Sequence, residues 1–384
     1  MILGYHAPLP PAATGVAEYA RDLFEGLKET QGCDGLAVGA AQADVQLCHL
    51  GNNPLHEAAH RVVESGAGRK LVFLHDATLH HYYLGVLSRE AYLEEFCRQY
   101  GSWYRDLAEQ LWRERAMAAS DPRYFEFGML ARVAGCSSAI LVHNAEARRR
   151  VLAQVPRAVV YQLPHYYRPR LAAAPWQVAR LRAQMGLTAT DTLFGVFGHL
   201  RESKRVLVVL RVFKRLRRRC ERLHLLIAGR AVSAEYERAI EAAVQQPGVI
   251  RRGFLSESEF WLFAQAVDVG INLRYPSCGE SSAIAVKLMG LGKAVILTAS
   301  GDPEFPGDCF VPVDAGAAEE EMLERWMVIL AQERRLREVL GRRAARWIAD
   351  HHRLDGVAQA IWGLARAIHA GLEPACTPLD SCGA

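Results

Sequence analysis

The stretch that decides the fold runs from Arg274 to Thr298 and reads RYPSCGESSAIAVKLMGLGKAVILT. Its loop contains Pro276 and Gly279, which break the preceding apolar run, and two serines that suit a helix N-cap. A helical pattern follows over Ala283–Leu291, and an apolar strand pattern comes next. Strand, loop, helix and strand in this order are typical of an α/β domain.

The start of this helix predicts an anion site. The first amides of a helix are unpaired and its dipole is positive at that end, so Gly279, Ser281 and Ser282 are placed to bind a phosphate. Glu280 would repel phosphate but could accept hydrogen bonds from sugar hydroxyls. A diphosphate carrying a sugar would satisfy both groups. An ordinary strand-to-helix turn with a solvated Glu280 is the open alternative.

A second segment of the same kind lies earlier in the chain. It reads LFGVFGHLRESKRVLVVLRVFKRL over Leu193–Leu216 and is followed by LHLLIAGR over Leu223–Arg230. Gly198 ends a buried strand and would let the backbone approach a ligand. Three cations cluster where the next helix is expected to begin: Arg201, Lys204 and Arg205. Cations there oppose the helix dipole, which favours an anion as their partner over a solvated basic turn.

With these segments in view, nearly the whole chain resembles the retaining glycosyltransferases of the GT-B fold, family 4 type, in a subgroup acting on surface polysaccharides. The start, ILGYHAPLPPAATGVAEYARDLFEGL, resembles the family's first strand and its proline-glycine loop, with Gly15 opening the helix beneath the donor phosphates. VQLCHLGNNPLHEAAHRV and LVFLHDATLHHYYLG resemble its next strand ends, where a histidine at the place of His75 lies beside the donor sugar, next to Asp76. RGFLSESEFWLFAQAVDVGINLRYPS places Phe254 near the nucleotide base.

The resemblance implies an α/β protein with two Rossmann-like doubly wound domains that face a central cleft, and a C-terminal helix that returns to the first domain. It implies transfer of a sugar from a nucleotide-sugar donor to a hydroxyl acceptor with retention of configuration. The expected catalytic residues are His75, Lys204 and Glu280. The expected donor-binding residues are Gly15, Gly198, His199, Arg201, Phe254, Gly279, Ser281 and Ser282. No metal and no cofactor are expected.

Two departures from the family pattern bear on the donor site. Members commonly carry a second Glu about eight residues after the first, near the ribose, where this chain has Lys287 and Leu288. Members also usually have a basic residue directly after the glycine placed at Gly198, where this chain has His199. A histidine with an ordinary pKa near 6.5 is a weaker constant charge than arginine.

Short apolar runs alternate with helical patterns along the chain and predict two domains. The first covers residues 1–168, with a helical insert over about 89–134 whose aromatic side chains mostly pack on the core. The second covers 176–352, after a proline-rich linker at Leu163–Trp176. Residues 353–371 form the returning helix, and 372–384 form a loose tail. The predicted strands are Ile2–Tyr5, Gly35–Val38, Val45–His49, Lys70–Leu74, Ala139–His143, Val159–Leu163, Leu193–Phe197, Leu223–Ala228, Gly248–Arg251, Val269–Asn272, Ala294–Leu297 and Cys309–Val311.

Composition agrees with this interpretation. A chain of 384 residues exceeds what one core usually organises, and a formal net charge of +4 is too mild to indicate nucleic acid. The nine cysteines show no CxxC spacing, which favours reduced thiols and excludes a zinc site of that type. No apolar run reaches about 18 residues, so we expect neither a secretion signal nor a membrane span. The expected location is the cytoplasm, with peripheral contact at the inner face of the membrane left open.

The clusters of basic residues and of histidines each have a structural explanation as well as a functional one. The basic residues between Lys214 and Arg219 fit a solvated helix face better than a membrane surface, and Arg148–Arg150 form the better membrane candidate if the acceptor is a lipid-linked glycan. His75, His80 and His81 resemble metal ligands, but no carboxylate accompanies them at zinc-type spacing.

Other functions on the same fold stay open. An epimerase of nucleotide sugars or a phosphorylase using free phosphate would leave no distinctive motif here. A catalytically degenerate scaffold that binds a nucleotide sugar or a partner glycosyltransferase would account for the missing second Glu. Convergence of Gly15, His75, Lys204 and Glu280 favours an active enzyme, because a scaffold has no physical need for all four.

Overall fold

The computed structural model describes residues 1–12, 14–170 and 172–372, and the chain forms two compact units. Unit 1 consists of Met1–His165, Cys278–Ser281 and Leu354–Ala384, and unit 2 of Tyr166–Ser277 and Ser282–Arg353. The short segment Cys278–Ser281 therefore belongs with the N-terminal half, which the sequence did not predict. Most of the predicted loose tail, residues 373–384, lies outside the described residues.

Unit 1 is built on a six-stranded parallel sheet in the order β2-β1-β3-β4-β5-β6. Its strands are β1 Leu3–His6, β2 Leu36–Val38, β3 Val45–Leu50, β4 Arg69–Leu74, β5 Ala139–Val142 and β6 Val160–Gln162. The central strands are buried on both faces because helices cover both sides, as is usual in parallel sheets.

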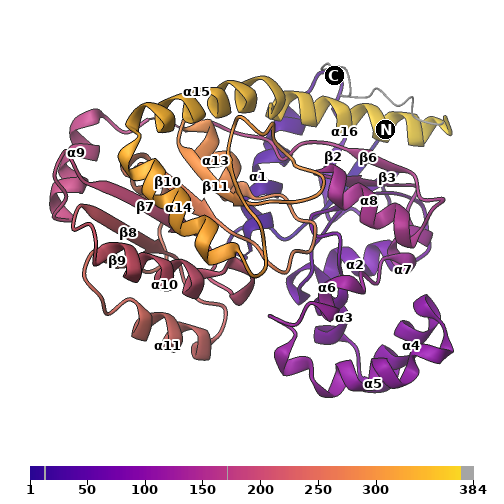
Figure 1. The fold of residues 1–384 in the computed structure, drawn as a ribbon. Coiled ribbons are helices and arrows are strands. Elements are labelled where there is room, and N and C mark those ends of the chain that lie inside the picture. The colour runs from indigo at the N-terminus through magenta and orange to yellow at the C-terminus, as the bar shows by residue number, and fades with distance from the viewer. Residues whose placement is uncertain (13, 171, 373–384) are drawn as a thin grey trace. The chain divides into compact units, whose positions relative to one another are not determined.

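The helices of unit 1 fall into two layers. Its helices are α1 Gly15–Lys28, α2 Glu57–Glu64, α3 His80–Val86, α4 Arg89–Tyr100, α5 Arg105–Arg113, α6 Arg123–Glu126, α7 Ala131–Gly135, α8 Ala145–Gln154 and α16 Leu354–Ala370, with short 3-10 turns at Pro54–His56, Ser102–Tyr104 and Arg115–Met117. Helix α16 packs on α1 and against β3 and β4, which confirms the predicted return of the last helix to the first domain (Figure 1). The segments from α2 to α8 enclose the apolar cluster on the other face.

The helical insert packs on the core as predicted. Tyr92, Phe96 and Tyr124 are fully buried in the same cluster as the sheet residues, and most of the other aromatic side chains of the insert pack against it. Trp103 is the exception because it follows the turn at Gly101 and is 80% exposed.

Unit 2 repeats the architecture with the strand order β12-β11-β10-β7-β8-β9, again parallel throughout. Its strands are β7 Thr192–Phe197, β8 Leu223–Ala228, β9 Val249–Arg252, β10 Val269–Asn272, β11 Ala294–Thr298 and β12 Val311–Val313. Its helices are α9 Pro175–Gln184, α10 Val206–Arg217, α11 Ala234–Ala243, α12 Glu257–Ala266, α13 Ala283–Gly290, α14 Glu319–Gln332 and α15 Arg334–His351, with a 3-10 turn at Glu202–Lys204.

Two apolar clusters cover the two faces of this second sheet. Side chains of α10, α11 and α14 pack with Phe194 and Val196 on one face, whereas those of α9, α12, α13 and α15 pack with Leu193 and Phe197 on the other. Adjacent residues of β7 thus enter opposite layers, as the pleat of a strand requires.

The predicted strands are confirmed, and only the last is clearly misplaced. We predicted it at Cys309–Val311, whereas β12 covers Val311–Val313. The amide of Cys309 is held in a turn by the carbonyl of Pro306, so pairing with β11 starts only at Val311. The seven described cysteines form no disulfide with one another. Among the described residues, no helix combines the length and apolar character that a bilayer crossing requires.

Candidate functional site

Gly198 and Lys204 lie together at the carboxyl end of β7, an edge where parallel α/β sheets commonly bind ligands. Gly198 has a φ of +90°, which favours glycine, and a Cβ there would stand 3.0 Å from Nζ of Lys204. Lys204 is 7% exposed, and its Nζ donates a hydrogen bond to the carbonyl of Phe197 (3.2 Å). Backbone and ammonium group are therefore packed tightly at the strand end.

An isolated bridge extends the pairing of β7 and β8 beyond their ends. The amide of Leu200 donates to the carbonyl of Arg230 (2.9 Å), and Leu200 pairs with Ala231. Leu200 is fully buried, whereas His199, Arg201 and Arg230 are exposed or partly exposed. Because side chains alternate along extended backbone, these three polar residues lie on the face opposite Leu200. Arg230 was missed by the sequence reasoning, although it directly follows a predicted strand and its glycine.

Arg205 does not join this cluster, which corrects the expectation that three cations gather at the helix start. Its backbone is left-handed (φ 57°), and α10 begins only at the next residue, Val206. Its guanidinium donates through Nε to both carboxylate oxygens of the buried Glu319 (3.0 and 3.1 Å), which raises the pKa of Arg205. Arg205 therefore forms a structural ion pair.

The loop before α13 has the predicted cap. Ser282 is its N-cap, with Oγ accepting the amide of Ala285 at 3.2 Å, so of the two serines predicted to suit this position Ser282 occupies it. Glu280 is half-buried, and its Oε2 accepts the amide of Cys278 at 2.7 Å. The carboxylate thereby closes its own loop.

Asn144 holds this loop within unit 1. Its Nδ2 donates to the carbonyl of Gly279 (3.1 Å) and to Oγ of Ser281 (2.9 Å), while its Oδ1 caps α8 by accepting the amide of Ala147 (2.8 Å). Gly279 has a φ of +73°, and a Cβ there would stand 3.1 Å from Cβ of Ala77. Gly279 therefore serves both the turn and the close packing. The sequence reasoning missed Asn144, although it directly follows the fifth predicted strand.

His75 and Asp76 directly follow β4. Oδ2 of Asp76 accepts the amide of Asn52 (2.8 Å), and Nδ2 of Asn52 lies 3.5 Å from Sγ of Cys278 and 2.8 Å from Nδ1 of His81. Asn52 thus connects the end of β3 to the Cys278–Ser281 segment, and the sequence analysis did not single it out.

Both ring nitrogens of His75 are occupied by other histidines. Its Nε2 lies 3.0 Å from Nδ1 of His49, and its Nδ1 lies 3.0 Å from Nε2 of His143. Burial and the neighbouring histidines hold the pKa of His75 well below its ordinary value, so the ring is neutral. The imidazole that the resemblance places beside the sugar therefore has its polar atoms turned into a buried chain.

Gly15 and Phe254 stand at exposed points. Gly15 is the first residue of α1, whose N-cap is Thr14, and a Cβ on Gly15 would meet no atom within 4 Å. Phe254 follows β9 and is 70% exposed, which suits a ring that stacks on a ligand. Lys287, at the place of the missing Glu, lies on α13 with Nζ 5.1 Å from the ring centre of Phe260 and 5.8 Å from that of Trp261.

One group among the described residues could hold a metal ion. Ligand atoms of Asp76, Cys278 and Glu280 lie within 4.8 Å of one another in unit 1. Each already has a hydrogen bond to Asn52 or within the loop. His80 and His81, which resembled metal ligands in the sequence, are instead engaged with Tyr92 OH (2.7 Å) and with the carbonyl of Ala118 (2.9 Å).

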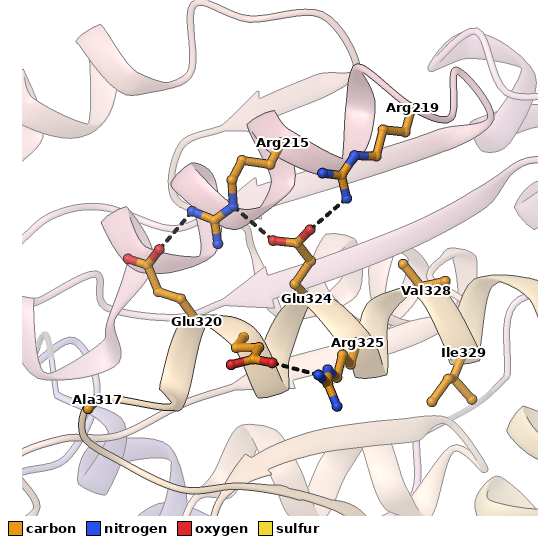
Figure 2. A pocket seen from close by; sticks show the side chains of 9 residues that line it. Arg215, Arg219, Ala317, Glu320, Glu324, Arg325, Val328 and Ile329 are labelled. Atoms are coloured by element: carbon orange, nitrogen blue, oxygen red, sulfur yellow. Dashed lines mark hydrogen bonds and ion pairs between the residues drawn. The ribbon is translucent and has the colours of Figure 1, made fainter.

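The basic stretch of α10 is largely exposed, as the sequence predicted, and part of it is paired with acidic residues of α14. Figure 2 shows Arg215 between Glu320 and Glu324 of α14, with Arg219 also paired to Glu324. These pairs line an open pocket on unit 2. Arg215 lies nine residues after Val206, the first residue of α10, and is therefore about 14 Å along the helix from the end near Lys204. In α8, Arg149 and Arg150 both pair with the single carboxylate of Glu146, so the candidate membrane cluster keeps a net positive charge.

Comparison with known proteins identifies the fold. No family model and no curated protein sequence matches the chain. Among solved structures, sucrose-phosphate synthase from Thermosynechococcus elongatus is similar over 96% of this chain and 99% of its own, with a TM-score of 0.69 and 13% identity. HepE from Anabaena, in complex with UDP and glucose, is similar over 94% of this chain and 98% of its own, with a TM-score of 0.67 and 13% identity. WaaG, a glycosyltransferase involved in lipopolysaccharide biosynthesis, covers 94% and 99%, with a TM-score of 0.61 and 14% identity.

These similarities span nearly the full length of each protein, and the predicted GT-B fold of two Rossmann-like units is confirmed. At such low identity the likeness concerns the fold, and the assignment of activity depends on the residues described above.

Proposed function

We propose that the chain is a glycosyltransferase that moves a sugar from a nucleotide-sugar donor to a hydroxyl acceptor with retention of configuration. The observation that carries the proposal is the buried Lys204 packed against Gly198 at the carboxyl end of β7, with Arg201 and His199 on the same loop. A diphosphate needs fixed cations and close backbone approach, and this strand end supplies both.

The proposed roles follow from the chemistry of the leaving group. The bond between the anomeric carbon and the β-phosphate oxygen breaks, and a bond from that carbon to the acceptor oxygen forms on the same face of the sugar. The acceptor's proton passes to the departing phosphate. Lys204 and Arg201 would stabilise the charge that develops on the diphosphate, and the amides at the start of α13 would add to it.

Glu280 would serve the sugar end of the donor. Glu280 accepts the amide of Cys278, and a carboxylate of this kind is a suitable acceptor for sugar hydroxyls. Phe254 would stack on the base, and Gly15 would allow close approach of the phosphates at the start of α1. HepE has been solved with UDP and with UDP-glucose, which supports a donor of this class for the shared fold.

We further propose an acceptor that is a glycan or a lipid-linked glycan in the assembly of a cell-surface polysaccharide or glycolipid, and a location in the cytoplasm. The resemblance of the strand-end segments supports this role, as does the involvement of WaaG, which shares the fold, in lipopolysaccharide biosynthesis.

A catalytically degenerate scaffold is the second candidate, because Lys287 replaces an acid and its ammonium group lies over two aromatic rings. Such a scaffold would bind a nucleotide sugar without turnover.

A thermal-shift panel tests the proposal. Purified protein is heated with UDP, GDP, ADP, TDP and CDP and their sugars, and we expect a selective rise in Tm. Lys204→Met keeps the buried volume and removes the charge, so it should abolish the rise, whereas Lys214→Met on the exposed face of α10 should keep it.

Turnover is then measured with the stabilising donor. Lys204→Met and Glu280→Ala should each lower it roughly tenfold or more, the scale of a lost transition-state contact. A Tm rise without detectable turnover in the wild type would favour the scaffold, and unchanged rates in folded variants would refute the site.

A further inference from the structure

A chain of three buried histidines runs across the carboxyl ends of adjacent strands in unit 1. His49 lies in β3, His75 follows β4 and His143 follows β5. The nitrogens that face one another are 3.0 Å apart at both links. Phe73 and Leu141 are register partners, and His75 and His143 each come two residues later, so the second link follows the register of the sheet.

The chain ends on a backbone carbonyl, and this fixes its direction. Nδ1 of His143 lies 3.3 Å from the carbonyl oxygen of Leu163, which can only accept a hydrogen bond. His143 must then carry its proton on Nδ1 and accept at Nε2. That acceptor requires a proton on Nδ1 of His75, whose Nε2 in turn accepts from Nδ1 of His49. Burial lowers the pKa of His49 and of His75, and with one proton on each of the three rings the hydrogen bonds require the same tautomer in all of them.

The other end of this row of histidines, at Nε2 of His49, is buried and has no hydrogen-bond partner among residues 1–12, 14–170 and 172–372. Aromatic rings surround the three histidines. The ring centre of Tyr19 in α1 lies 4.9 Å from that of His75 and 5.3 Å from that of His143. Phe73 stacks on His75 at 5.0 Å.

An apolar layer would fill this space at lower cost, because buried polar groups must be satisfied in full and one here is not. Buried polar chains of this kind rigidify and specify one arrangement of their members. The central member, His75, is the residue that the family resemblance places beside the donor sugar. Tyr19 comes four residues after Gly15 in α1, and ligands of α/β sheets commonly bind at this edge.

We propose that His49 and His143 are positioning residues, which lock the ring of His75 in one plane and in the Nδ1–H tautomer, so that this buried ring keeps one orientation and directs no free nitrogen at a donor. The part that concerns the donor rests on the proposed function. The locked tautomer is a property of the free protein, and it can be tested without any ligand.

The test uses histidine-selective 15N NMR of the full chain at pH 7.5, with signals assigned by single substitutions. We expect His75 and His143 to show a protonated Nδ1 and an unprotonated Nε2. In His143→Phe the acceptor for Nδ1–H of His75 is lost, and the His75 signals should shift toward averaging between tautomers. His143→Gln places an amide oxygen near the position of Nε2 and should restore the locked signals.

Turnover separates positioning from simple packing. We expect His143→Phe to lower kcat roughly tenfold with His143→Gln recovering most of it, and likewise a loss in His49→Leu that His49→Asn recovers, since asparagine keeps a donor near the position of Nδ1. A wild-type spectrum with His75 protonated on Nε2 would overturn the proposal, as would an unchanged His75 spectrum and kcat in His143→Phe. If the tautomer is locked but no nucleotide sugar binds or reacts, the proposed function fails and the positioning of the ring by its neighbours stands.

Discussion

Asn144 donates a hydrogen bond from Nδ2 to Oγ of Ser281 at 2.9 Å while the other atom of the same amide, Oδ1, caps helix α8. One side chain thus joins the end of β5 to the segment that carries Glu280. The two functions can be separated by substitution, because aspartate caps a helix as well as asparagine does but has no hydrogen to donate.

Asn144→Asp should loosen the Cys278–Ser281 segment and leave α8 intact. It removes the hydrogen bond to the carbonyl of Gly279 at a cost of about 1–3 kcal/mol and sets a carboxylate against that carbonyl, although Oγ of Ser281 can donate to the new carboxylate. Hydrogen exchange at residues 280–282 should become about tenfold faster or more. Asn144→Ala should in addition speed exchange in the first turn of α8. Unchanged exchange at 280–282 in the aspartate variant would contradict this account.

Acid should destabilise the protein because several histidines are buried and neutral. Burial lowers the pKa of His49, His60 and His80 to about 3, whereas unfolded histidine titrates near 6.5. Between these values the unfolded state binds more protons than the native state, so stability is fully present above pH 6.5 and is lost as the pH falls toward 3.

Each such histidine contributes a slope of about 1.4 kcal/mol per pH unit well below pH 6.5. Urea midpoints measured at pH 7.5, 6.5 and 5.5 should fall steadily. His60→Phe keeps a ring that can stack on Tyr82, as His60 does at 3.6 Å, and should reduce the slope by one histidine's share. Equal midpoints across this range would show that these rings are not buried and neutral.

The elements of the fold are predictable from the sequence because most strands are short, predominantly apolar runs that alternate with helical patterns. The start of α10 is not, since it depends on the left-handed backbone of Arg205, a residue type that rarely adopts this conformation. Gly198 and Lys204 can be predicted from the sequence, because a glycine and a cation after a buried strand are typical of a phosphate site. The neighbours of His75 cannot, because His143 is one polar residue among many until the register of β4 with β5 places it beside His75.

Gly198→Ala should separate backbone strain from loss of the site. An alanine at a φ of +90° is strained by about 1–2 kcal/mol, and its Cβ would displace Nζ of Lys204, which stands 3.0 Å away. Gly186→Ala is the matched control, because Gly186 has a φ of +74° and an added Cβ there meets nothing within 4 Å.

Both variants should lose similar stability in urea, whereas only Gly198→Ala should weaken binding of UDP, or of whichever diphosphate raises the Tm most, by roughly tenfold. Equal binding by the two variants would place the diphosphate elsewhere.

Removal of divalent metal should leave turnover unchanged. Asp76, Cys278 and Glu280 could in principle share an ion, but Asp76 and Glu280 each accept a backbone amide and Cys278 accepts from Asn52, so the group is satisfied without one. Turnover after dialysis against EDTA should stay within about twofold of that of the untreated protein. If a metal ion stabilised the charge on the leaving diphosphate, its removal would lower turnover far more. A rise in Tm with Mn²⁺ or Zn²⁺ that disappears in Cys278→Ser, together with lost turnover after EDTA, would show that this segment binds a catalytic ion and that the prediction of a metal-free site is wrong.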